Sequence, residues 1–252
     1  METEAMCSKY DAQVIEYIDA NMTRPEEHQH TLIINHVFEI IAEAQPKPSA
    51  KEVSKFFHGL IITEDKDGNI IQHAIKGFTD HVNESAIKID GTYSLSGRLL
   101  GYNSQSPALF FYDNSHSLIC RTPVHLESDM INKVHTSGLG IVVKIIREDP
   151  NDFLNATIIL IKHTDYDRVN NCSVSFLVQY VQPGLESMLK PSLWAIPGNQ
   201  VLINGHIVGH DPLMKVWKIR CYENVRHFHG TKGNGIKKAL KRNCPDWSLA
   251  RL

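Results

Sequence analysis

The stretch VLINGHIVGHDPLMKVWKIRCY, residues 201–222, decides the fold class. Apolar and polar residues alternate on both sides of Asp211-Pro212, a dipeptide that favours a turn. Alternation with a period of two is typical of strands that bury one face. The stretch therefore predicts an antiparallel β-hairpin. Its predicted buried face consists of Val201, Ile203, Gly205 and Ile207 on one strand and Trp217, Ile219 and Cys221 on the other.

Burying both apolar rows predicts the register of this hairpin, because a slip of one residue would turn each row to the other face. The HDPLM segment is the predicted connection. The outer face of the hairpin then carries mostly polar and basic side chains. The predicted cross-strand pairs are Ile207 with Trp217, Gly205 with Ile219, His206 with Lys218, and Asn204 with Arg220.

The period-two pattern extends over most of the chain after residue 90. Glycine, Asn-Ser, Asp-Pro and Asn-Asn separate the runs. Most connections are too short for a crossover helix, which favours antiparallel meanders over a parallel sheet. The predicted strands are 92–102, 107–113, 117–122, 140–147, 155–163, 173–181, 200–209 and 215–222.

Two of these strands resemble each other. Residues 93–102, YSLSGRLLGY, and residues 201–210, VLINGHIVGH, both place a glycine within the strand and another four residues later. A glycine inside a strand marks a bulge or a tight bend. The similarity indicates either two barrels or two strands that bend alike. Because no fourth and fifth strand is evident between Pro123 and Gly138, we do not expect a complete second copy.

Residues 138–225 contain three strands, an intervening segment and the hairpin. Gly140-Ile-Val-Val begins the first strand, and residues 197–205, PGNQVLING, lead into the fourth. This order and spacing resemble the oligonucleotide/oligosaccharide-binding (OB) barrel. The resemblance implies a five-stranded barrel. It also implies a binding cleft formed by the outer face of strands two and three and by the loops after strands one and four.

The first 85 residues are predicted to be mainly helical. Apolar residues recur at helical spacing over 11–22 and 31–45, and a capping box at Ser49–Glu52 opens a third helix that ends at Gly59. LIITE and NIIQHAI flank a turn at Asp65–Gly68 and predict a hairpin. Three helices and a hairpin are also the element order of a winged helix. The predicted fold class is α+β, with a helical region (1–85), an antiparallel β region (86–228) and a basic tail (229–252).

Composition and charge exclude several classes of protein and cellular location. The net charge of −2 excludes a chain that coats nucleic acid over its whole surface. The five scattered cysteines and the absence of a signal-peptide pattern favour an intracellular protein, nuclear or cytoplasmic, with reduced thiols. No apolar run is long enough for a membrane span. We therefore expect no membrane partner.

Catalytic and metal-binding motifs are not found in the sequence. It contains no CxxC, HExxH, GxSxG or phosphate-binding loop. The segment His163–Arg168 groups an imidazole with two carboxylates, but it is better explained as a polar turn between strands. We therefore expect a non-enzymatic protein with no cofactor and no metal.

Binding of single-stranded DNA or RNA is the preferred hypothesis, because cations and exposed rings on the barrel suit phosphates and bases. A protein-interaction module without a nucleic-acid role is the alternative, because a shared fold does not determine function. The tail adds positive charge that can increase phosphate affinity. The candidate binding residues are Lys144, Arg147, Phe153, Lys162, Tyr166, His206, Lys215, Lys218, Arg220, Tyr222, Lys237, Lys238, Lys241 and Arg242.

Overall fold

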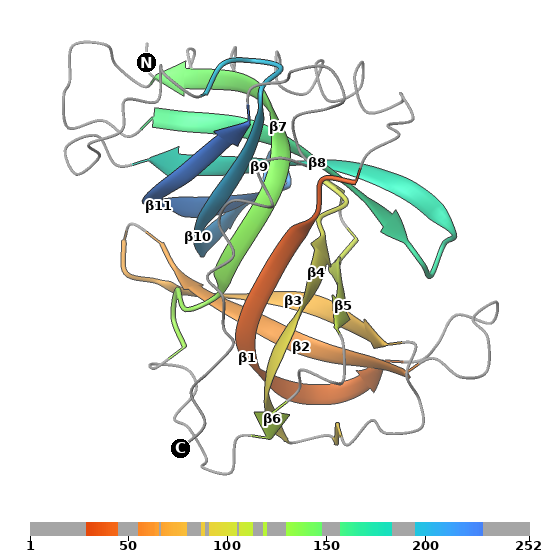
Figure 1. Cartoon of the computed structure of the whole chain (residues 1–252). Coiled ribbons are helices and arrows are strands. Elements are labelled where there is room, and N and C mark those ends of the chain that lie inside the picture. Colours follow the sequence, from red (N-terminus) through yellow and green to blue (C-terminus); the bar gives the residue numbers. More distant parts are fainter. Residues whose placement is uncertain are drawn as a thin grey trace, which may run out of the picture.

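The computed structural model describes residues 29–44, 55–65, 67–79, 87–88, 91–104, 106–112, 118–119, 130–147, 157–182 and 195–228. Within these residues every regular element is a strand, and eleven strands form one continuous sheet. The sheet curls into two barrels, which Figure 1 shows one above the other. Within the described part of the chain, no helix is long and apolar enough to cross a bilayer.

The first barrel is built from five strands. They are β1 (Leu32–Ala44), β2 (Lys55–Glu64), β3 (Ile70–Thr79), β4 (Thr92–Leu100) and β5 (Ala108–Tyr112). Their order is β1-β2-β3-β5-β4, and pairing of β4 with β1 closes the barrel. The β3–β5 pair is parallel and the others are antiparallel. A short strand, β6 (Leu118–Ile119), extends the edge of β4.

The second barrel repeats this topology. Its strands are β7 (His135–Arg147), β8 (Thr157–Asp167), β9 (Cys172–Gln182), β10 (Gln200–Asp211) and β11 (Val216–Phe228). The order is β7-β8-β9-β11-β10, β10 closes onto β7, and β9–β11 is the parallel pair. A closed five-stranded barrel with this order is OB-like. The predicted OB-like barrel is therefore confirmed, and the same topology occurs a second time in the chain.

The two similar sequence stretches are the fourth strands of the two barrels. Gly97 in β4 and Gly205 in β10 occupy equivalent places, each beside the fifth strand of its barrel. A Cβ at Gly97 would overlap the carbonyl of Phe111, and one at Gly205 would overlap the carbonyl of Arg220. The prediction that a complete second copy is absent was wrong, because the other barrel draws its first three strands from residues before 80.

The predicted α+β class was wrong, and so was the winged-helix alternative. The predicted helix 31–45 is largely β1, in which Leu32, Ile34, His36, Phe38 and Ile40 are buried on one face. Apolar residues on both faces made the segment compatible with a helical period. Its β-branched residues fit a pleated strand, and closure of the barrel supplies the partners. The proposed third helix overlaps β2, and the predicted helix 11–22 lies outside the described residues.

The opening hairpin is present as β10 and β11, and the predicted buried faces are correct. Bulges displace the register, one of them between Ile207 and Gly209. Ile207 consequently lies opposite Ile219, and His206 lies opposite Arg220. The predicted pairs were therefore displaced by two residues. A displacement by an even number preserves the face of each side chain, which explains why the burial was predicted correctly.

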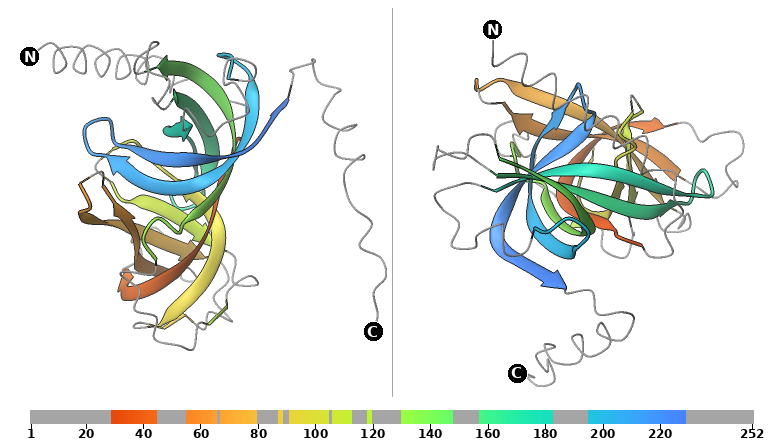
Figure 2. Two further views of the ribbon diagram at one scale, coloured as in Figure 1. Left: turned by 90° about the vertical axis from the view of Figure 1, so that its left-hand side faces the viewer. Right: turned by 90° about the horizontal axis from the view of Figure 1, so that it is seen from above.

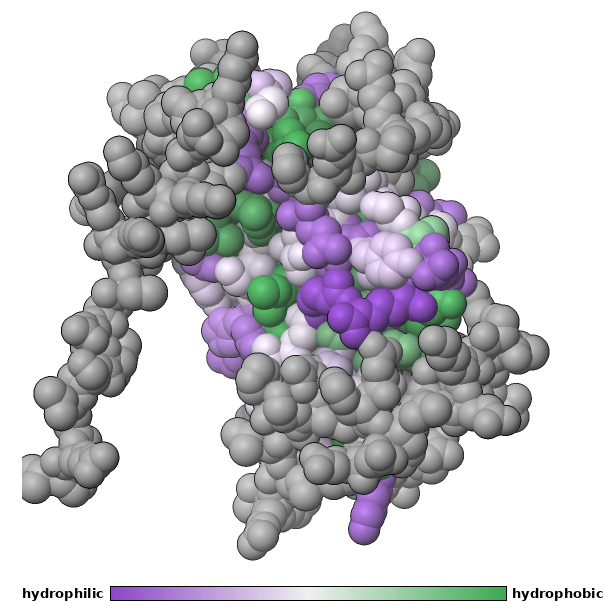
Figure 3. Space-filling model, turned by 45° about the vertical axis from the view of Figure 1, so that its right-hand side comes forward, coloured by the Kyte–Doolittle hydropathy of each residue, from purple (hydrophilic) through white to green (hydrophobic). Residues whose placement is uncertain are grey.

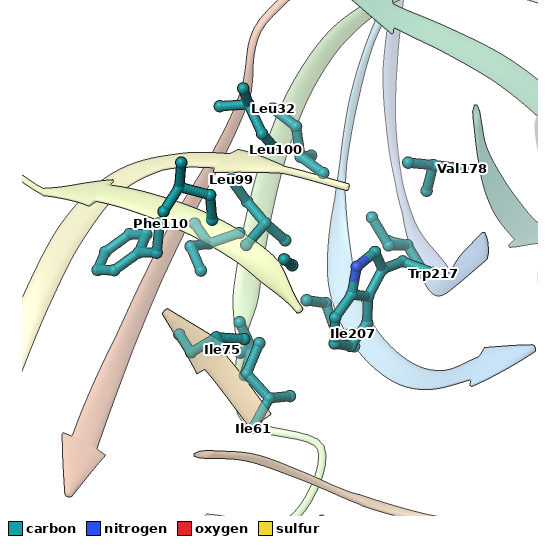
Figure 4. Close-up of a cluster of buried hydrophobic side chains, with 14 of the residues drawn as sticks. Leu32, Ile61, Ile75, Leu99, Leu100, Phe110, Val178, Ile207 and Trp217 are labelled. Atoms are coloured by element: carbon teal, nitrogen blue, oxygen red, sulfur yellow. The ribbon is translucent and has the colours of Figure 1, made fainter. Parts of the chain in front are cut away.

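The two barrels share one hydrophobic core. Residues of both belong to a single buried cluster, and Figure 4 shows Ile61, Ile75 and Leu99 near Ile207 and Trp217. At the same junction β1 pairs with β7. The barrels are therefore packed against each other rather than joined by chain connectivity alone. Figure 2 shows from two further sides how closely the two barrels lie. On the surface, polar side chains gather across the middle of one described face (Figure 3).

Buried polar contacts also cross the junction. The predicted polar turn at His163–Arg168 is mostly the end of β8, so that prediction was wrong. Asp165 forms an ion pair with Arg98 of β4, and Asp167 accepts a hydrogen bond from Tyr102. The turn begins at Arg168, directly after β8, and Asp167 accepts hydrogen bonds from the backbone N–H groups of Val169 and Asn170 in it.

Candidate nucleic-acid interface

The outer face of the β10–β11 hairpin brings several predicted binding residues together. His206 lies opposite Arg220 on β11 and opposite His135 on β7, because β10 pairs with both strands. Arg220 and His135 are exposed, and His206 is half-buried. We define the hairpin patch as this outer face around His206 together with the neighbouring residues at the start of β7. It consists of Lys133, His135, His206, Arg220 and Tyr222.

An exposed aromatic ring lies at the centre of the hairpin patch. Tyr222 keeps 38% of its surface exposed. Its hydroxyl lies 2.8 Å from Nδ1 of His135, and its ring centroid lies 5.4 Å from that of His206. These contacts hold the tyrosine ring between two imidazoles while one part of it stays accessible. Such a ring can stack on a flat ligand at little cost in side-chain entropy.

The hairpin patch is electrostatically positive. The pKa of His206 is lowered first by burial and then by the charges of Arg220, His135 and Lys133. Each of these neighbours disfavours a further positive charge on the imidazole. His206 is therefore predominantly neutral at pH 7, and the charge of the patch comes from Arg220 and Lys133. An anion placed among these groups would gain favourable electrostatic energy.

Lys218 stands in a different environment on the same face of β11. Its Nζ lies 3.1 Å from Oδ2 of Asp211. Burial alone would raise the pKa of Asp211, but hydrogen bonds from Met214 and Lys218 lower it below the usual value. Asp211 therefore partly offsets the charge of Lys218. It also closes the β10–β11 turn by accepting the N–H groups of Leu213 and Met214.

The outer face of β8 and β9, which the OB resemblance implies as the cleft, carries an apolar cluster among polar residues. Buried Leu160, Leu177, Met214 and Val216 form a cluster outside the barrel core. Lys144 pairs with Leu160, and Lys162 pairs with Leu177, at the border of this cluster. Neither lysine belongs to the hairpin patch, because Lys144 lies nine residues beyond His135 on β7 and Lys162 lies on β8.

The remaining predicted residues are dispersed. Tyr166 is exposed near the end of β8 and donates a hydrogen bond to Asn171, away from the hairpin patch. Lys215 lies in the β10–β11 turn. The backbone of Arg147 ends β7. Phe153, Lys237, Lys238, Lys241 and Arg242 lie outside the described residues.

Sequence reasoning did not identify Lys133 and His135. They precede the predicted first strand of the second barrel, which in fact begins at His135. The alternation of exposed Lys133 and His135 with buried Val134 and Thr136 was the available signal. Only closure of β10 onto β7 places these residues beside His206.

Comparisons with known proteins yield similarity of structure only. No protein-family model matches the chain, and no curated protein sequence matches it. A solved structure of the single-stranded DNA-binding protein from Thermus aquaticus is similar at 8% identity, with a TM-score of 0.45, over 83% of this chain and 98% of that one. The Ifi202 HINa domain in complex with 20-bp double-stranded DNA is similar at 9% identity, with a TM-score of 0.22, over 77% of this chain and 94% of that one.

Proposed function

We propose that this protein binds single-stranded nucleic acid and that the hairpin patch is the contact surface. The observation that carries the proposal is the exposed ring of Tyr222 next to Arg220, His135 and Lys133. Proteins that bind single strands combine cations for the backbone with rings on which bases stack. The hairpin patch supplies both within one small surface.

The mechanism has two parts. Arg220 and Lys133 attract the phosphates, and displacement of counterions makes this part sensitive to salt. Tyr222 stacks on one base, and its contacts with His135 and His206 keep its ring oriented. Stacking depends weakly on base identity because every base has an aromatic face. We therefore expect modest sequence preference.

The test is fluorescence anisotropy of a labelled, mixed-sequence single strand, as DNA and as RNA, at low and at physiological salt. We expect affinity to fall steeply as salt rises, and Tyr222→Ala to weaken binding about tenfold through lost stacking. Tyr166→Ala is the matched control, because it removes an exposed tyrosine outside the hairpin patch. Absence of binding at low salt would contradict the proposal and favour a protein-interaction module.

A further inference from the structure

A cavity of about 440 Å³ lies where the two barrels meet. The first barrel contributes part of β3 and the segment between β4 and β5. The second barrel contributes the tip of the β10–β11 hairpin. The volume falls in the range of pockets that hold small organic ligands. Its lining includes His73, Asn103, His210, Lys215 and Trp217.

Three aromatic rings meet in the wall of this inter-barrel cavity. The Trp217 centroid lies 5.3 Å from that of His73 and 5.1 Å from that of His210, with interplanar angles of 69° and 70°. The two imidazoles are themselves 6.0 Å apart. The wall therefore offers both ring faces and ring edges, which suits a flat heteroaromatic ligand.

Both imidazoles of the wall are neutral at physiological pH. Burial, followed by the charge of His210, lowers the pKa of His73 to about 4. Burial is also the main cause that lowers the pKa of His210. A neutral imidazole offers one donor and one acceptor. Nε2 of His73 is engaged at 2.8 Å by Thr63, so His73 is held in place.

A hydrogen-bonded asparagine fixes the opposite wall. Nδ2 of Asn103 donates to the carbonyls of Leu177 at 3.0 Å and Lys215 at 2.9 Å, and Oδ1 accepts the N–H of Leu177. These bonds tie the segment after β4 to β9 and to the β10–β11 turn. The cavity is thus formed before any ligand arrives, which reduces the ordering cost of binding.

One cation at the cavity can approach a phosphate of the ligand, while the charge of Asp211 also reaches the wall at His210. None of the described residues that line it is acidic, and Lys215 is among them. The cavity also belongs to the same hairpin as the hairpin patch. Tyr222 and Trp217 are five residues apart on β11, on the order of 17 Å along an extended strand. An odd separation places the two rings on opposite faces of β11, so a bound strand has to pass round the tip of the β10–β11 hairpin to contact both.

We infer that the inter-barrel cavity accepts one unstacked nucleobase of a single strand bound to the hairpin patch, with Lys215 beside an adjoining phosphate. This inference rests on the proposed function and adds a second contact to it, in a pocket open to solvent. The base packs against Trp217 and His210, while its sugar-phosphate backbone stays in solvent. The site favours single strands, because extruding a base from a duplex costs unstacking and unpairing energy.

The first experiment uses the full chain with Trp194→Phe and Trp247→Phe, so that Trp217 alone reports by fluorescence. The probe is the shortest mixed-sequence strand that retains full affinity, together with versions that each lack one base. We expect the intact strand to quench Trp217. We also expect loss of the base that enters the cavity to weaken binding about tenfold.

The decisive comparison is made with His210→Ala. In this variant, omitting the base at that one position should no longer weaken binding, because the cavity has lost a side chain that contacts the base. The matched control, His58→Ala, removes a half-buried imidazole on β2 that does not line the cavity and should retain the weakening. An unchanged weakening in His210→Ala would overturn the inference, even if the strand binds well.

Failure of the proposed function is recognised separately. If no strand binds at low salt, the hairpin patch proposal fails, and the cavity is then tested with free adenosine and thymidine. Quenching of Trp217 by either nucleoside, lost in His210→Ala and kept in His58→Ala, would retain the cavity as a nucleobase site. Absence of quenching at millimolar nucleoside would overturn the inference as well.

Discussion

The phenolic hydroxyl of Tyr102 donates a 2.6 Å hydrogen bond to Oδ2 of Asp167. This bond joins the segment after β4, in the first barrel, to the end of β8, in the second. Burial, and then the bond to Asp167, raises the pKa of Tyr102 above its ordinary value. Together with the Arg98–Asp165 ion pair, it links the two barrels through side chains far apart in the sequence.

Removal of Arg98 is expected to destabilise the protein strongly. The side chain of Asp165 has no exposed surface, so Arg98→Ala would leave a buried charge without its partner. We expect a loss of about 3 kcal/mol in the free energy of unfolding. Tyr102→Phe should lose only about 1 kcal/mol, since Asp167 keeps bonds from Val169 and Asn170.

Urea unfolding measures both effects. A double variant, Arg98→Leu with Asp165→Leu, removes the two charges together and should recover much of the lost stability. If Arg98→Ala and Tyr102→Phe cost the same, the ion pair does not contribute as we argue.

Gly205→Ala should destabilise the second barrel. A Cβ at this position overlaps the backbone carbonyl of Arg220, so β10 and β11 would have to separate locally. We expect a loss of about 2 kcal/mol. Gly209→Ala in the same strand is the control, because no atom lies within 4 Å of its added Cβ. Chemical denaturation of the two variants checks the difference, and equal losses would refute the steric explanation.

Mild acid should destabilise the protein through His163. This imidazole is fully buried, lies 3.0 Å from the Tyr180 hydroxyl, and has a pKa lowered to about 4, mainly by burial. Below pH 6.5 the unfolded chain binds a proton that the folded chain does not. The stabilisation is therefore present above pH 6.5 and is lost as pH falls toward 4, by about 2 kcal/mol at pH 5.

Thermal unfolding between pH 7 and pH 5 follows this loss. His36 and His73 have pKa values lowered in the same direction and should add to it. NMR titration assigns the cause to individual rings. A midpoint near 6.5 for His163 in the folded protein would disprove the linkage.

Arg220 and Lys218 should contribute unequally to nucleic-acid binding. Asp211 already offsets part of the Lys218 charge, whereas Arg220 belongs to the group of cations around His206. We expect Arg220→Ala to weaken binding several-fold more than Lys218→Ala and to reduce the salt dependence by about one phosphate contact. Anisotropy titrations at several salt concentrations provide both values. Equal effects would indicate that the Asp211 pair does not reduce the contribution of Lys218.

The sequence alone determined the strands whose buried face alternates clearly with polar residues. In β10 and β11, the rows containing Ile207 and Ile219 were assigned to the core from alternation alone. The glycines at 97 and 205 marked equivalent strands, because only a residue without a Cβ fits against the neighbouring carbonyl. Local steric requirements of this kind leave a pattern within one short segment, so they can be recognised from its sequence.

Tertiary structure decided what depends on distant partners. Residues 32–44 carry apolar side chains at both helical and strand spacing, and only pairing with β2, β4 and β7 makes them a strand. The bulges of β10 set its register, and closure onto β7 brings His135 beside His206. The hairpin patch and the inter-barrel cavity exist because long-range strand pairing, rather than any short motif, assembles their side chains.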